Sequence, residues 1–195
     1  MDALDQRVIA AVASHPSVRS IHLVGSRAEG RSTARSDWDF LVETDDFEWM
    51  ADDLPALCAP LDPLAQQWDR LSSRYCWMLM LCGPAKIDLI FADQPHRCEP
   101  PWEVTGEALP AIDTHFWDWA LWLHGKASAG ADDLVAGELE KLHQHLLEPL
   151  GVPQSPSSVR AAVAAYRSAR AAAEQRFNLR VRRDLEREVA RSLGR

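Results

Sequence analysis

Residues 23–42 read LVGSRAEGRSTARSDWDFLV, and their pattern is the most informative about the fold of the first half of the chain. A short apolar strand ends at Gly25-Ser26, a polar loop follows, and a second strand then alternates Asp with large apolar residues. Because residues i and i+2 of a strand point to the same face, Asp37 and Asp39 should present two carboxylates side by side at the edge of a sheet. The residues that alternate with them, Trp38 and Phe40, should then point into the core.

A third carboxylate has a similar setting. Asp88 lies between Ile87 and Leu89 in the apolar segment KIDLIFA, residues 86–92, which is typical of a strand. Adjacent carboxylates repel each other unless a cation lies between them, and oxygen ligands of this kind suit Mg²⁺ together with substrate phosphates. On a neighbouring strand, Asp88 would complete a metal site or take a proton from an attacking hydroxyl.

The polar loop has the residue types that bind phosphate. A glycine at position 25 lets the backbone approach an anion closely, and Ser26 offers a hydroxyl and a backbone N–H. Arginine side chains along the loop can neutralise the charge of a triphosphate; they are Arg27, Arg31 and Arg35. A metal site beside a phosphate site indicates phosphoryl or nucleotidyl transfer from a nucleoside triphosphate.

The same stretch resembles the nucleotidyltransferase superfamily with the DNA polymerase beta-like fold, whose pattern is Gly-Ser, ten residues and Asp-x-Asp. Ten residues separate Ser26 from Asp37, Ser36-Asp37-Trp38-Asp39 is similar to the family's Ser-Asp-x-Asp, and the likeness covers roughly residues 20–92. Trp38 departs from the family's usual small aliphatic residue. The resemblance implies that Asp37, Asp39 and Asp88 are catalytic and bind Mg²⁺, with Asp88 as third ligand or general base. It implies a nucleotide site made of Gly25, Ser26, Arg27, Arg35 and Ser36.

Patterning along the chain indicates an α+β protein with a mixed sheet, followed by an all-α region. We expect helices at 2–14 and 47–57, and strands at 20–25, 38–44, 64–68, 75–82 and 86–92. After Asp93 several prolines interrupt the strand pattern, and the sequence beyond them has helical patterns. We expect helices from Asp113 to about 124, at 132–147 and at 159–193. The expected domains are therefore a nucleotidyltransferase head at 1–95 and a helical domain at 96–195.

The net charge of −8 is divided unevenly. Residues 156–195 hold ten arginines and four acids, a net of +6, so the first 155 residues carry −14. An acidic body attracts cations and repels nucleic acid. The basic tail has three open interpretations: a solvated helix face, a surface docking on the acidic body, or a site for an anionic ligand.

The helical half of the sequence says less about the molecule that would accept the transferred nucleotide. Four tryptophans near one helix, at 102, 117, 119 and 122, are either core residues or an aromatic wall for a ring-bearing substrate. Asp113, Asp118 and Glu103 lie close by in sequence and could bind cationic groups, although Asp113 also suits a helix cap. His143 and His145 fall on different helix faces, which disfavours zinc.

These features predict a cytoplasmic, Mg²⁺-dependent adenylyltransferase that moves AMP from ATP, or a nucleoside monophosphate from another NTP, to a small-molecule hydroxyl. The resemblance includes enzymes that modify aminoglycoside antibiotics, and the acidic body suits a cationic acceptor. Two alternatives stay open: a toxin–antitoxin type enzyme that modifies a protein or tRNA, and a non-catalytic nucleotide-binding module. We expect a monomer or homodimer without a membrane segment or secretory signal, and a nucleic-acid partner is disfavoured.

Overall fold

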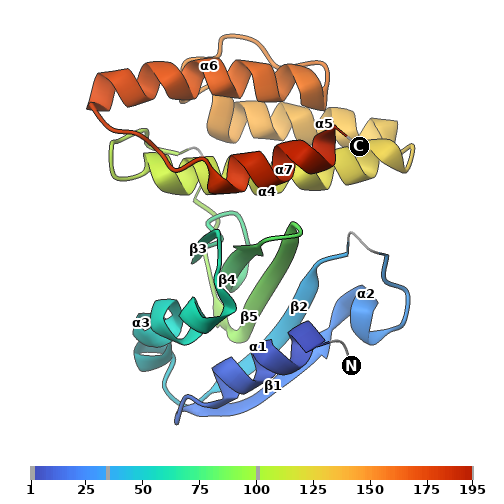
Figure 1. Ribbon diagram of the computed structural model, residues 1–195, viewed down its shortest axis with the longest axis vertical. Helices are drawn as coiled ribbons and strands as arrows, with labels where there is room; N and C mark the ends of the chain where they lie inside the picture. Colours follow the sequence, from blue (N-terminus) through green and yellow to red (C-terminus); the bar gives the residue numbers. More distant parts are fainter. Residues whose placement is uncertain (1–2, 34–35, 100–101, 195) are drawn as a thin grey trace. The chain divides into compact units, whose positions relative to one another are not determined.

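The computed structural model describes residues 3–33, 36–99 and 102–194. The chain divides into two compact units, Met1–Cys98 and Glu99–Arg195. The first combines helices with a mixed five-stranded sheet, and the second is built from helices (Figure 1). The predicted α+β class with a helical C-terminal region is thus confirmed. In the described ranges no helix has both the length and the apolar character needed to cross a bilayer.

The sheet has the strand order β1-β2-β5-β4-β3. Its strands are β1 (Val18–Val24), β2 (Trp38–Thr44), β3 (Ala65–Trp68), β4 (Arg74–Leu81) and β5 (Ala85–Pro95). β2 pairs antiparallel with β1 and parallel with β5, and β4 pairs antiparallel with both β5 and β3. β2 is therefore an internal strand, so Asp39 lies near the start of an internal strand and not at a sheet edge as expected.

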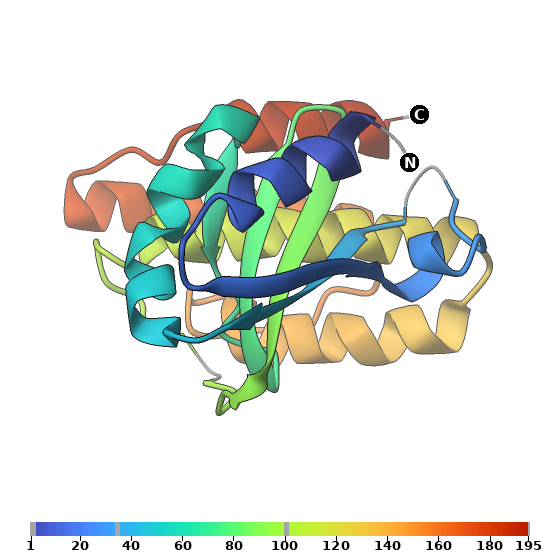
Figure 2. The same cartoon turned by 90° about the horizontal axis from the view of Figure 1, so that it is seen from below.

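Two helices cover one face of this sheet (Figure 2): α1 (Ala3–Ala13) and α3 (Phe47–Cys58). Asp46 immediately precedes α3, and its side chain caps the helix by accepting a hydrogen bond from the backbone N–H of Trp49. A short turn, η1 (Ala59–Leu61), follows it. The core between helices and sheet includes Val8, Val12, Phe40, Met50, Leu54, Ile87 and Leu89.

Large apolar residues alternate with Asp39 along β2, and the apolar ones face the core as predicted. Trp38 and Phe40 are 6% and 0% exposed and belong to this core. Asp39 lies between them in the strand, so its side chain points to the opposite face of the sheet. β5 repeats the pattern, since Ile87 and Leu89 are in the core and Asp88 lies between them. Both carboxylates are thus placed away from the helix-covered face.

The second unit contains four α-helices among its described residues. They are α4 (Leu109–Ser128), α5 (Asp132–Leu142), α6 (Val159–Phe177) and α7 (Asp184–Leu193), with one π-helical turn, η2 (His143–Leu147), after α5. α4 and α6 pack through aromatic side chains: the rings of Phe116 and Tyr166 stack with centroids 3.7 Å apart. Trp117 meets Tyr166 edge-on at 5.9 Å. Trp117 is fully buried, so for this tryptophan the core interpretation is correct.

The single helix predicted over 159–193 is wrong, because it is two helices. α6 ends at Phe177, and the next residue, Asn178, has φ +51° and adopts the left-handed conformation that terminates helices. Asn tolerates this conformation better than most residues with a side chain. The chain then turns through 178–183 before α7 begins, and this lets arginines of the turn contact acids of α6 and α7.

The predicted cap at Asp113 is also wrong. α4 begins four residues earlier, at Leu109, and Asp113 is 3% exposed in its second turn. The sequence pattern missed a further element, the single turn α2 (Gly25–Ala28), at the start of the segment expected to be loop. A four-residue turn is too short to show helical periodicity.

Candidate active site

The strand register brings Asp39 and Asp88 together. In the parallel pairing of β2 with β5, Asp39 lies directly opposite Asp88, as Trp38 lies opposite Ile87. Asp88 is 8% exposed and Asp39 is half-buried. Asp37 is half-buried and immediately precedes β2, so it is not itself within the strand. Two carboxylates from separate strands therefore share the sheet face opposite the main core.

Gly25 lies against Asp39, one member of this carboxylate pair. It follows β1, whose last residue, Val24, lies opposite Asp39, and it begins α2. Its φ is +68°, and a Cβ added there would lie 2.6 Å from Oδ2 of Asp39. Both facts require glycine, since the left-handed backbone disfavours other residues and the space of a side chain is already taken. The Gly-Ser and Asp-x-Asp parts of the motif are thus in direct contact.

We expect Gly25→Ala to destabilise the protein by about 2–4 kcal/mol, because it combines left-handed strain with a displaced Asp39. Gly30→Ala is a matched control: Gly30 has φ +67°, but a Cβ added there would have nothing within 4 Å. That variant should lose only about 1 kcal/mol, the cost of the backbone conformation. Urea unfolding of both variants measures the difference. Equal losses would show that Asp39 moves away at no cost.

The Arg27 side chain hydrogen-bonds to the backbone of the residues just before β2. Its Nε donates to the carbonyl oxygens of Ser36 at 3.0 Å and Asp37 at 3.1 Å, and its second terminal nitrogen donates to Ser36 at 2.7 Å. Its guanidinium also lies 3.8 Å from the centroid of the Trp38 ring. These contacts fix the backbone that leads into Asp37 and Asp39. Arg27 therefore positions the segment that leads into the carboxylate strand, and its predicted contact with phosphate stays a prediction.

Lys86 is a neighbour of the carboxylates that sequence reasoning missed. Its Nζ lies 3.2 Å from Oδ2 of Asp88, and the side chains of the two residues are only 15% and 12% exposed. Burial raises the pKa of Asp39, while the charges of Lys86 and Arg27 oppose that rise. The i, i+2 spacing of Lys86 and Asp88 in a strand was the signal that could have identified this pair.

Other predicted residues are less closely associated. Ser36 lies in the loop before β2, where its hydroxyl accepts from the backbone N–H of Thr33 at 2.9 Å. Ser26 is the second residue of α2, and Arg31 is exposed and pairs with Glu29. Arg35 lies outside the described residues. The part of the chain that the structure describes has no cluster of three or more His, Cys, Asp or Glu residues suited to hold a metal ion.

The acidic residues of the helical half have separate surroundings. Asp113 accepts from Tyr166 at 2.6 Å, Arg170 at 2.7 Å and the Trp117 indole at 3.2 Å. The Asp113 carboxylate is therefore already paired with side chains of α4 and α6, including the cation of Arg170, and is not placed to bind a cationic ligand. Glu103 is exposed and Asp118 is buried. Trp119 is partly buried and donates to Glu138 at 3.2 Å.

The basic tail is largely neutralised within its own unit. Arg170 bridges Asp113 and Glu186, and Arg183 contacts Glu174 at 2.7 Å. Further ion pairs join Arg167 with Glu186, Arg182 and Arg187 with Asp184, and Arg191 with Glu188. The exposed pairs of Arg182, Arg187 and Arg191 fit a solvated helix face, and the pair of Arg170 with Asp113 joins the tail to the acidic part of the chain. The interpretation as a site for an anionic ligand stays open.

Comparison with solved structures finds a weak similarity. The chain resembles the crystal structure of an aminoglycoside 6-adenyltransferase from Bacillus subtilis. The TM-score is 0.35 and the identity is 9%, over 97% of this chain and 95% of that chain. A likeness at this level establishes neither a family nor an activity. No protein-family model matches the chain, and no curated protein matches it in sequence.

Proposed function

We propose that the chain is a nucleotidyltransferase that moves AMP from ATP to a hydroxyl of a cationic small molecule. The observation that supports this most is the register that sets Asp39 beside Asp88, with Gly25 packed against Asp39. Lys86 pairs directly with only one of these two carboxylates, so the pair keeps a negative charge that suits a metal cation. The net charge of −8 favours a cationic acceptor, of which aminoglycoside-type antibiotics are an example.

Mg²⁺ is the cation that this donor set fits best. It is commonly bound through one or two carboxylates together with substrate phosphates, so Asp39 and Asp88 are enough on the protein side, with Asp37 as a further candidate. The contact between Gly25 and Oδ2 of Asp39 supports the fit, because it holds a carboxylate oxygen next to the turn that would receive phosphate. When bound, the metal would neutralise phosphate charge and polarise the reacting oxygens.

The residues of the chain would then share the remaining work. Ser26 and the backbone of α2 would contact the phosphates, and Arg27 would keep the Asp37–Asp39 segment in place through its carbonyl contacts. Lys86 would balance the charge of Asp88 until the nucleotide binds. Asp88 would accept the proton of the acceptor hydroxyl.

The transfer itself is a single displacement. The acceptor oxygen forms a bond to the α-phosphorus of ATP, and the bond from that phosphorus to the bridging oxygen of the β-phosphate breaks. Pyrophosphate leaves with the electron pair, and the proton of the hydroxyl passes to the carboxylate base. The products are the adenylylated acceptor and pyrophosphate.

A mass-spectrometric transfer screen tests the proposal. The protein is incubated with Mg²⁺ and each of the four NTPs, and with two acceptor pools: cationic antibiotics, and protein and tRNA extracted from cells. A gain of one AMP on a small molecule supports the proposal. A gain on a protein or tRNA instead favours the toxin–antitoxin type of enzyme. Binding of nucleotide by calorimetry with no transfer to either pool would favour the non-catalytic module.

A further inference from the structure

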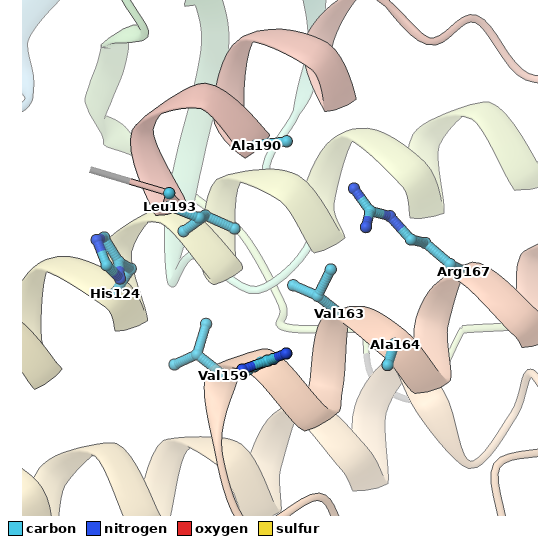
Figure 3. Close-up of a pocket in the computed structure, with 9 residues that line it drawn as sticks. His124, Val159, Val163, Ala164, Arg167, Ala190 and Leu193 are labelled. Carbon is cyan, nitrogen blue, oxygen red and sulfur yellow. The ribbon is translucent and has the colours of Figure 1, made fainter.

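The helical unit contains a cavity that the proposed transfer reaction does not use. It has a volume of about 480 Å³ and is bounded by α4, α6 and α7 (Figure 3). This volume lies within the range of about 300–1,000 Å³ that is typical of small-molecule sites. The cavity belongs entirely to residues of the second unit, so it can be considered independently of the carboxylate pair.

Most of its wall is apolar. Val159 and Val163 of α6 and Leu193 of α7 point toward the same space in Figure 3, and Ala164 and Ala190 add methyl groups. These two alanines leave the space open because their side chains end at Cβ. A ligand with a compact apolar body would therefore gain from leaving water.

The polar side chains that line the cavity are all basic. They are His124 of α4 and Arg160 and Arg167 of α6, and none of the lining residues is acidic. Arg167 is held in place by Glu186, at 2.8 Å. Arg160 is exposed and forms no ion pair with any residue that the structure describes, unlike the six neutralised arginines of the same unit. A cationic group thus remains available at an apolar cavity in a chain of net charge −8.

We propose that this cavity binds a small amphipathic anion, with its apolar body among Val159, Val163 and Leu193 and its carboxylate at Arg160 and His124. Charge complementarity decides the sign of the ligand, because a guanidinium binds a carboxylate through charge-assisted hydrogen bonds and would repel an ammonium group. The sign is opposite to that of the cationic acceptor proposed above. The cavity is therefore a second site whose ligand is distinct from the acceptor, and it does not depend on the transfer activity.

Methyl NMR of the full-length chain gives a direct test, since five lining residues have methyl groups. Octanoate is the probe, and octylammonium has the same apolar chain with the opposite charge. We expect octanoate to shift the methyl signals of Val159, Val163 and Leu193 saturably, with octylammonium at least about tenfold weaker. Equal binding of the two probes, shifts scattered over other methyl groups, or no shift with octanoate would each overturn the proposal.

Two variants locate the site. Arg160→Gln should weaken octanoate binding by about five- to tenfold, the effect of one charge-assisted contact, and Ala164→Phe should abolish it by filling the space. Ala164 is exposed, so a larger side chain is tolerated by the fold. Arg182→Gln is the control, because the Arg182 side chain is 79% exposed and does not line the cavity. Unchanged affinity in Arg160→Gln would remove that residue from the site and overturn the assignment.

Discussion

Asp39→Asn should lower the rate of AMP transfer by at least about a thousandfold while the protein remains folded. The amide has nearly the shape of the carboxylate, so the β2–β5 register and the contact with Gly25 can persist. It lacks the negative charge that pairs with a cation beside Asp88, and a neutral amide oxygen is a weaker ligand for Mg²⁺. Initial rates on an acceptor found by the transfer screen, at saturating ATP and Mg²⁺, measure the effect.

The stability of the same variant provides a separate readout. Burial raises the pKa of Asp39, which means that the folded protein disfavours its ionised form. Removing the charge should therefore leave the thermal midpoint of unfolding unchanged or higher at pH 7. Asp45→Asn is the matched control, because Asp45 is exposed just after β2 and pairs with Arg19. Transfer at the wild-type rate in Asp39→Asn would contradict the site assignment, and a loss in Asp45→Asn would show that the effect is not specific.

Arg170→Ala should have the largest effect on stability, about 3–5 kcal/mol of the free energy of unfolding. Arg170 is 4% exposed, and it donates to Asp113 at 2.7 Å and to Glu186 at 2.5 Å. Its removal leaves the buried Asp113 carboxylate without its cation, and Tyr166 and Trp117 cannot replace the charge. Guanidinium-induced unfolding of the full chain, followed by tryptophan fluorescence, measures the loss.

The loss of stability in Arg170→Ala should be smaller at low pH than at neutral pH. Burial raises the pKa of Asp113 in the folded state, and Arg170 opposes that rise. A carboxyl whose folded pKa lies above its unfolded value favours folding at low pH, and that stability falls as the pH rises through the folded pKa. Without Arg170 the pKa rises further, so the deficit of Arg170→Ala should be smaller at about pH 4 than at about pH 7.

The control for this variant is Arg182→Ala, which removes an exposed ion pair with Asp184 and should change stability by less than about 0.5 kcal/mol. If Arg170→Ala were no worse than this control, the contacts of Arg170 would not contribute to stability. A deficit that grows at low pH would contradict the role given to Asp113.

Local patterns were enough to predict most elements of the first unit. The alternation of Trp38, Asp39 and Phe40 identified β2 and the side that faces the core, because strand periodicity is a property of neighbouring residues. The α6–α7 break was missed, since Asn178 interrupts an otherwise continuous helical pattern through one backbone angle. Asp113 was misplaced for a related reason: a carboxylate near a helix start looks like a cap until its partners are known.

The candidate site was predicted in its residues but not in its contacts. The spacing Gly-Ser, ten residues and Asp-x-Asp selected Gly25 and Asp39, the later apolar strand selected Asp88, and their chemical roles stay predictions. The ion pair of Lys86 with Asp88 and the positioning contacts of Arg27 emerge only when the strands are aligned.

The amino-acid pattern alone predicts the strands, most of the helices, the buried side of β2 and the uneven distribution of charge. These depend on residues close together in the chain, where periodicity and composition carry the information. Three further features become visible only in the folded chain: Asp39 lies opposite Asp88, Gly25 has no space for a side chain, and Arg170 neutralises Asp113. Each of these joins segments far apart in sequence, and the pairing of such segments is set by the packing of the whole unit.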